Sequence, residues 1–134
     1  MRPRLTTYSW GDKRRRGEGV RLSCTRYLPR GVKRSDRAKL DYMDVWLPLL
    51  APSRRLISFI KRNGDDPKAW ATFVRRYRTE MSKTDARQTI QALAHLSEKT
   101  PISIGCSCPG HPCHRFVLER LIRAAGKNKG RSPD

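Results

Sequence analysis

The chain has 134 residues, of which 37% are hydrophobic, 30 are Lys or Arg and 12 are Asp or Glu, so its formal net charge is +18. This length suits one compact domain with a buried core, and no run approaches the roughly 20 apolar residues of a membrane helix. We therefore expect one domain with no membrane span. Because no apolar signal segment opens the chain, we also expect a cytoplasmic location.

The positive charge is concentrated in the first third of the chain. Residues 1–39 carry 13 basic residues against three acidic ones, a net charge of +10. Such a field attracts polyanions and speeds their encounter with the protein. The charge therefore predicts a nucleic acid or another polyanion as partner. A heavily charged surface without such a partner is the alternative.

Two strands and one helix are predicted in the first fifty residues. Residues 5–10 and 20–25 are rich in β-forming side chains, and a basic loop over 11–19 separates them. The apolar residues of 40–50 recur at helical spacing and predict a helix, which Pro48 shortens or kinks.

Three helices are predicted next, each with its own start signal. Ser53 is the expected N-cap of the first, and Gly64 ends it. Asp66, followed by proline, restarts the helix, whose aromatic and apolar residues continue at helical spacing to Met81 and are expected in the core. Asp85 is the expected cap of the third helix.

A short strand and a final helix complete the predicted domain, residues 1–126. Residues 101–105 form an apolar run typical of a buried strand, and 112–125 predict a helix that ends at Gly126. Residues 127–134 lack apolar anchors, so we expect a basic mobile tail. The order β-β-α-α-α-α-β-α predicts an α/β fold, a few-stranded, mostly parallel sheet covered by helices.

Three of the four cysteines and two of the three histidines lie within residues 106–114, between the last predicted strand and the last helix. This kind of junction is where parallel α/β proteins place reacting groups and bind anions. In an intracellular chain, clustered cysteines favour metal binding, redox chemistry or catalysis over a disulfide framework.

Zinc binding is one interpretation of the cluster, because Zn²⁺ prefers thiolate and imidazole ligands in a tetrahedral set. The candidate ligands are Cys106, Cys108, His111 and Cys113. Their spacing is not that of two paired Cys-x₂-Cys motifs, so a zinc finger is not indicated.

Thiol catalysis is a second interpretation. Cys113 is expected in the first turn of the last helix, where the helix dipole and Arg115 would lower its pKa. His114 or His111 would then be the acid–base partner. The candidate catalytic residues are therefore Cys113, His114 and Arg115.

A further set of residues is predicted to bind phosphate and bases. Arg26 and Arg30 follow the second strand and Arg115 follows the last, so all three approach one end of the sheet if those strands are adjacent and parallel. The arginine fork suits phosphate. Aromatic side chains stack on bases, and the candidates here are Tyr8, Trp10 and Tyr27.

Four segments resemble motifs of the DUF488 family, in the family's order. Residues 26–32 are similar to its Arg-x-x-Pro-Arg-Gly-Val motif, and residues 46–53 to its Trp-Leu…Ala-Pro-Ser segment. Residues 73–81 resemble its Phe-x-x-Arg-Tyr helix. Residues 113–115, with Cys106 upstream, resemble the Cys…Cys-His-Arg ending of one branch.

The resemblance covers about residues 5–125 and implies an α/β fold without a settled activity. Thr25 stands where the family often has Asp, and Cys108 where the branch tends to have Glu, so the resemblance implies no acid-dependent mechanism here.

Together these observations predict a DUF488-like protein that binds nucleic acid or another phosphate-containing partner, with the Cys/His/Arg loop as its local site. Two alternatives stay open. One is a thiol- or zinc-dependent enzyme acting on a small anionic substrate. The other is a plain binding module in which cysteines such as Cys24 and Cys106 are buried small hydrophobes.

Overall fold

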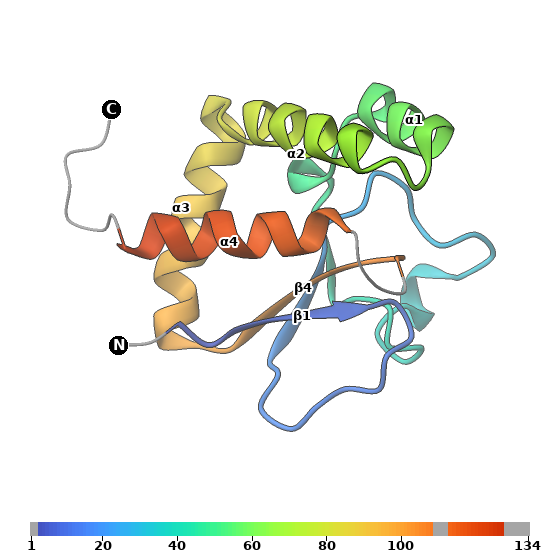
Figure 1. The fold of residues 1–134 in the computed structure, drawn as a ribbon. Helices are drawn as coiled ribbons and strands as arrows, with labels where there is room; N and C mark the ends of the chain where they lie inside the picture. The colour runs from blue at the N-terminus through green and yellow to red at the C-terminus, as the bar shows by residue number, and fades with distance from the viewer. Residues whose placement is uncertain (1–2, 109–112, 128–134) are drawn as a thin grey trace.

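The computed structural model describes residues 3–108 and 113–127. In these residues one four-stranded sheet has the order β1-β4-β2-β3, and every neighbouring pair is parallel (Figure 1). The strands are β1 Leu5–Ser9, β2 Val20–Ser23, β3 Val45–Trp46 and β4 Ile102–Cys106. The α-helices are α1 Arg54–Asn63, α2 Pro67–Met81, α3 Thr84–Lys99 and α4 His114–Lys127. The predicted α/β fold, a single small domain with a parallel sheet, is confirmed.

The central position of β4 fixes where the functional residues meet. β4 lies between β1 and β2, and all five of its residues are buried. Because the strands are parallel, their carboxyl ends share one edge of the sheet. That edge brings Cys106 beside Ser9 of β1 and next to Cys24, which follows β2.

One face of the sheet is apolar and lies under the helices. Leu22, Ile102 and Ile104 point to this face and join the main hydrophobic core. Figure 1 shows α4 lying across β1 and β4, with α3 beside it. The alternation of buried apolar and polar residues along these strands therefore reflects a sheet with two different faces.

The opposite face is polar and is covered by loops rather than helices. Arg21 is fully buried there, with its Nε 2.6 Å from Glu18 Oε2 and its guanidinium 4.3 Å from the centre of the Tyr8 ring. Burial alone would raise the pKa of Glu18. The hydrogen bonds from Arg21 and from the Arg15 amide outweigh burial and hold that pKa at about 2. Arg21 is therefore part of the fold, and its charge does not face the solvent.

Gly105 is required by the packing of this polar face. A Cβ atom built on Gly105 would meet three ring atoms of Tyr8, the nearest too close for any real contact. Tyr8 is the register partner of Gly105 in the neighbouring strand β1. The ring therefore occupies the space that a side chain at position 105 would need.

The predicted helix boundaries between residues 53 and 81 are confirmed. The Ser53 hydroxyl accepts a hydrogen bond from the Leu56 amide, and the Asp66 carboxylate accepts one from the Lys68 amide. Gly64 ends α1 with a positive φ of 39°. The expected cap at Asp85 is wrong, because α3 begins at Thr84 and its N-cap residue is Lys83.

The helix predicted over 40–50 is wrong. Asp41 has a left-handed φ of 62°, which a continuous right-handed helix does not allow. The segment then forms β3, which pairs with β2, and a 3₁₀ turn over Pro48–Leu50. The order is therefore β-β-β-α-α-α-β-α. Hydrogen bonds to β2 outweighed a helical pattern of apolar residues.

The last helix starts and ends slightly later than predicted. α4 begins at His114, so Cys113 lies immediately before it, and the helix continues through Gly126 to Lys127. Of the predicted tail, residues 128–134 lie outside the described part of the chain. In the described ranges, every helix is too short or too polar to cross a membrane.

Candidate functional site

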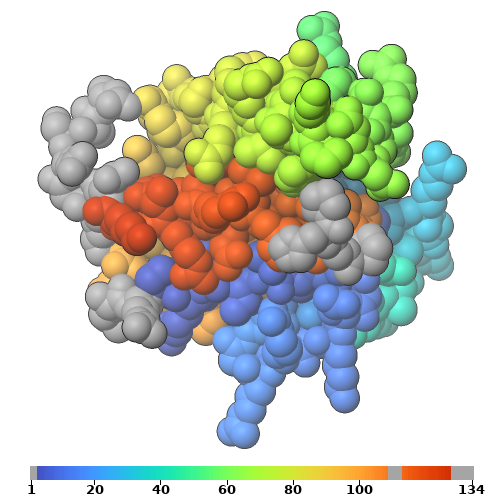
Figure 2. All heavy atoms as spheres, in the orientation of Figure 1, coloured from blue at the N-terminus to red at the C-terminus, as the bar shows by residue number. Residues whose placement is uncertain are grey.

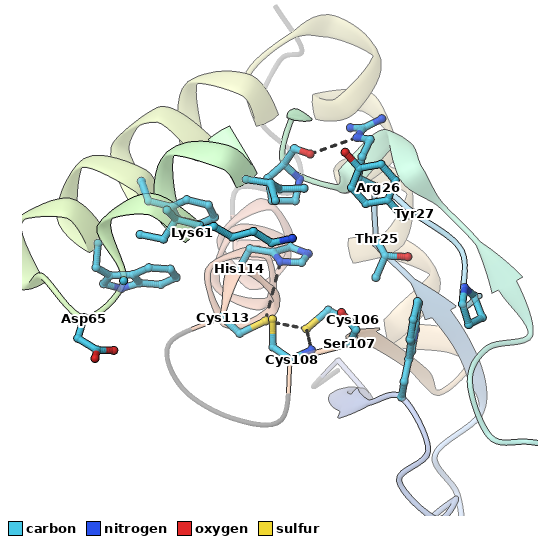
Figure 3. Close-up of a pocket in the computed structure, with 18 of the residues that line it drawn as sticks. Thr25, Arg26, Tyr27, Lys61, Asp65, Cys106, Ser107, Cys108, Cys113 and His114 are labelled. Atoms are coloured by element: carbon cyan, nitrogen blue, oxygen red, sulfur yellow. Dashed lines mark hydrogen bonds between the residues drawn. The ribbon is translucent and has the colours of Figure 1, made fainter. Parts of the chain in front are cut away.

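A pocket of about 790 Å³ opens at the carboxyl ends of β2 and β4 (Figure 3). The β4–α4 junction supplies the cysteines at its base, and residues 25–30 after β2 line one wall. The opposite wall comes from α1 and the start of α2. Open α/β sheets bind ligands at this edge, so the fold places the pocket where a functional site is expected.

Cys106 and Cys113 meet at the base of the pocket. Their Sγ atoms are 2.7 Å apart, and both residues are buried. Cys106 Sγ also accepts hydrogen bonds from the Cys108 amide at 3.3 Å and from Arg115 Nη1 at 3.1 Å. The sulfur of Cys106 is therefore surrounded by donors.

The two cysteines have opposite pKa shifts. Hydrogen bonds from Cys108 and Cys113, with a further one from Arg115, lower the pKa of Cys106. Hydrogen bonding to Cys106 in turn raises the pKa of Cys113. The pKa shift expected at Cys113 is therefore wrong in direction, and the hydrogen-bond donors converge on Cys106.

His114 holds a single orientation. Its Nε2 lies 2.7 Å from the carbonyl oxygen of Cys24, which can only accept, so Nε2 carries the proton. Burial lowers the pKa of His114 and favours its neutral form. The lone pair of Nδ1 then faces Cys113 Sγ at 3.8 Å. The ring of Tyr77 packs against the imidazole with their centres 5.6 Å apart.

Arg115 belongs to the cysteine cluster. Besides Cys106, its Nη1 donates to the Cys108 carbonyl oxygen at 2.6 Å, an oxygen that also accepts from Ser9 Oγ. Only 6% of the residue is exposed. Arg115 therefore fixes the turn after β4 and has little surface left for an external phosphate.

The two other predicted phosphate ligands differ in their contacts. Arg26 donates to the carbonyl oxygens of Pro52 and Ala51, at 3.2 and 3.1 Å, and Figure 3 shows the first of these bonds. It therefore fastens the segment after β2 to the chain before α1. Arg30 is exposed and lines the pocket.

The three residues predicted to stack on a base also differ in how accessible their rings are. Tyr8 is 2% exposed and packs between Arg21 and Gly105, so it offers no ring face to a base. Trp10 lines the pocket, with its Nε1 donating to Ser23 Oγ at 2.9 Å. Tyr27 lines it too and is 50% exposed.

Sequence reasoning missed the residues that the helices contribute. Lys61 of α1 is exposed and directed into the pocket in Figure 3. Trp70 of α2 was expected in the core, and it both stacks on Phe73, with 4.8 Å between ring centres, and lines the pocket. Nothing in the local spacing of either residue signals this role, because it depends on how α1 and α2 pack over the sheet edge.

Cys106, Cys113 and His114 form a group that could hold a metal ion. The donor atoms of Cys106, Cys113 and His114 all lie within 4.8 Å of one another. Cys108 lines the same pocket and is partly exposed. The predicted ligand His111 lies outside the described residues. Zinc is thus possible in the sense that two thiols and an imidazole meet at one point.

Comparison with known families identifies the chain. A model named DUF488-N3a, described as the active DUF488-N3 subclade, matches residues 5–126. Neither the curated proteins nor the solved structures give a match. The family match covers most of the sequence, so the chain belongs to the DUF488 family, as its motifs indicated.

Proposed function

We propose that this member of the DUF488 family binds nucleic acid and takes one nucleotide unit into the pocket beside the cysteine cluster. The observation that carries the proposal is the lining of that pocket. Trp10, Tyr27 and Trp70 supply aromatic surface for a base, while Arg30 and Lys61 supply positive charge for a phosphate.

The charge around the pocket supports a polymeric ligand. The loop between β1 and β2 and the segment after β2 project from the body, at the bottom and right of Figure 2. Both carry exposed basic side chains: Lys13, Arg15, Arg16, Lys33 and Arg34. A nucleic acid backbone running past the pocket would meet these cations and release its counterions on binding.

The size and shape of the pocket favour an unpaired base. A volume of about 790 Å³ is within the range of sites for small organic ligands. A base stacked and paired within a duplex cannot enter such a recess, whereas a single strand can present its bases without breaking pairs. Single-stranded DNA or RNA is therefore the expected ligand.

Titration of a fluorescent single-stranded 12-mer tests the proposal. Lys61→Ala should weaken binding by about tenfold, the effect of losing about 1.4 kcal/mol of charge contact. Lys99→Ala is the matched control, because Lys99 ends α3 at the opposite edge of the sheet, before β4 begins. Raising salt from 50 to 200 mM should weaken wild-type binding by about 50-fold if about four phosphates are neutralised. Equal losses of affinity in the two variants, or an affinity that does not depend on salt concentration, would reject the pocket as the nucleotide site.

A second candidate function is zinc binding by the cysteine cluster, and the orientation of His114 favours it. A His that ligates zinc usually donates its other ring N–H to a carbonyl or carboxylate. Here Nε2 donates to the Cys24 carbonyl, which leaves Nδ1 free on the side of Cys113. Cys106 and Cys113 would be two thiolate ligands and Cys108 the fourth ligand. Zinc bound there would supply a closed structural link between β4 and α4.

Zinc would fit this group only if the two cysteine sulfurs moved apart. Tetrahedral ligands at about 2.3 Å from zinc stand roughly 3.8 Å apart, so the Cys106 and Cys113 sulfurs, at 2.7 Å, would have to separate by about 1 Å. Metal analysis of the purified protein tests this candidate. One zinc per chain, lost in Cys106→Ser and retained in Cys24→Ala, would support it, because Cys24 points to the Leu22 carbonyl. Absence of metal from the wild-type protein would reject it.

A further inference from the structure

We propose that Cys106 and Cys113 form a redox-active dithiol pair, which a small hydroperoxide oxidises to a disulfide. This is an activity beyond the binding of nucleic acid. It rests on the 2.7 Å between the two Sγ atoms and on the donors that converge on one of them.

The two sulfurs are held together by regular elements of the fold. Cys106 is the last residue of β4, the central strand, and Cys113 directly precedes α4. A disulfide needs about 2.05 Å between its sulfurs, so bond formation moves these atoms by less than about 1 Å. The other two cysteines are placed differently. Cys24 Sγ is directed to the Leu22 carbonyl, and Cys108 is the more exposed residue of the cluster.

The donors around Cys106 suit it for the first step. Arg115 Nη1 and the Cys108 amide both point at Cys106 Sγ, so they stabilise negative charge on that sulfur. Arg115 is 6% exposed, and its buried Nε has no hydrogen-bond partner within the described residues. Arg115 therefore acts on Cys106 through Nη1, in a contact shielded from solvent.

The burial of Cys106 and Cys113 limits the size of an oxidant that can reach them. Cys106 is 1% exposed and Cys113 is 2% exposed, although both border the pocket. A bulky disulfide must approach the attacked sulfur in line and needs more space than this. Hydrogen peroxide is small enough to reach Cys106 from the pocket.

The reaction balances in two steps. The Cys106 thiolate attacks one peroxide oxygen, forming an S–O bond as the O–O bond breaks. The departing hydroxide takes a solvent proton, which gives a sulfenic acid and water. The Cys113 sulfur then attacks the Cys106 sulfur, forming the S–S bond as the S–O bond breaks. The Cys113 thiol proton, for which His114 Nδ1 is a neighbouring acceptor, leaves with the hydroxide as a second water. Two thiols and one peroxide thus yield one disulfide and two waters.

The test uses the reduced full-length protein, freed of reductant and treated with one equivalent of hydrogen peroxide without nucleic acid. We expect thiols titrated after denaturation to fall from four to two per chain. Peptide mapping should join Cys106 to Cys113. A disulfide that includes Cys24 or Cys108 instead, or four thiols remaining, would overturn the proposal.

Two variants separate the roles of the cysteines. Cys113→Ser removes the resolving thiol, so a sulfenic acid should persist at Cys106 and be trapped by dimedone. Cys24→Ala is the matched control. It keeps the backbone carbonyl that accepts from His114 and removes only a thiol directed to the Leu22 carbonyl, so it should form the same disulfide within about twofold of the wild-type rate. Dimedone trapped at Cys108 in the Cys113→Ser variant would contradict the assignment. The wild-type peptide map remains decisive if a variant fails to fold.

Discussion

Single residues of the candidate site act through contacts that the residue type alone does not reveal. One chain of contacts runs from the Cys24 carbonyl to the turn after β4, through His114, Cys113, Cys106 and Arg115 in that order. The sequence predicted the membership of this cluster but assigned the thiolate to Cys113. The donors to Cys106 come from a backbone amide and from a side chain nine residues away, which no local motif encodes.

The packing of Gly105 against Tyr8 can be tested by mutation. Gly105→Ala places a Cβ into the ring of Tyr8, so we expect the free energy of unfolding to fall by about 1–3 kcal/mol. Gly126→Ala is the control, because its new Cβ would meet only Ala94, at 3.9 Å, and alanine favours a helix by up to about 1 kcal/mol. Urea denaturation measures both. Equal stability of wild type and Gly105→Ala would refute the packing argument.

Glu18 gives a test that depends on pH. Its folded-state pKa of about 2 lies below the ordinary value of 4.5, so the carboxylate stabilises the fold above pH 4.5. That contribution is lost as the pH falls from 4.5 towards 2. We therefore expect Glu18→Gln to be less stable than wild type at pH 7 and the difference to shrink steadily below pH 4.5. Chemical denaturation at several pH values measures the gap, and a gap independent of pH would contradict the role of the Arg21 ion pair.

At the scale of elements, local signals predicted most helix and strand boundaries, and pairing between distant segments decided the rest. Ser53, Gly64 and Asp66 act as the expected caps because each makes its capping hydrogen bond with a backbone group that is close in the sequence. The segment 40–50 was predicted as a helix, but its strand β3 pairs with β2, in which Leu22 is the register partner of Val45. Periodicity within a segment cannot report a partner strand.

The cap of α1 also ties two helices together, which can be measured. Ser53 donates from its amide and hydroxyl to the two oxygens of Glu80 in α2, at 2.9 and 2.6 Å. Ser53→Ala should cost about 1–2 kcal/mol of stability, and a double-mutant cycle with Glu80→Ala should show coupling above about 0.5 kcal/mol. Asp66→Ala removes a cap with no bond to Glu80 and serves as the control. Additive effects of Ser53→Ala and Glu80→Ala would show that the link is not energetic.

In the whole molecule, the positive charge behind the net +18 is partly buried and partly exposed. Part of it is structural, since Arg21 and Arg115 are buried and Arg26 holds backbone carbonyls. The remainder is exposed, including the two projecting segments and the rim of the pocket. The sequence predicted the field but not the pocket, because β2, β4, α1 and α2 must first pack before their side chains face one another. Lys61 and Trp70 therefore join the site only in three dimensions.

A nucleotide unit in the pocket would lie against the cysteine cluster and shield Cys108, so the alkylation rate of Cys108 reports whether the pocket is occupied. Cys108 is partly exposed and lines the pocket. The rate at which iodoacetamide modifies Cys108 should be measured by mass spectrometry at fixed pH, with and without a saturating single-stranded 12-mer. We predict that the bound strand slows modification of Cys108 by about tenfold or more, since a ligand present at ten times its dissociation constant leaves about one pocket in ten empty. An unchanged rate at saturation would show that the nucleic acid binds elsewhere and that no nucleotide unit occupies the pocket.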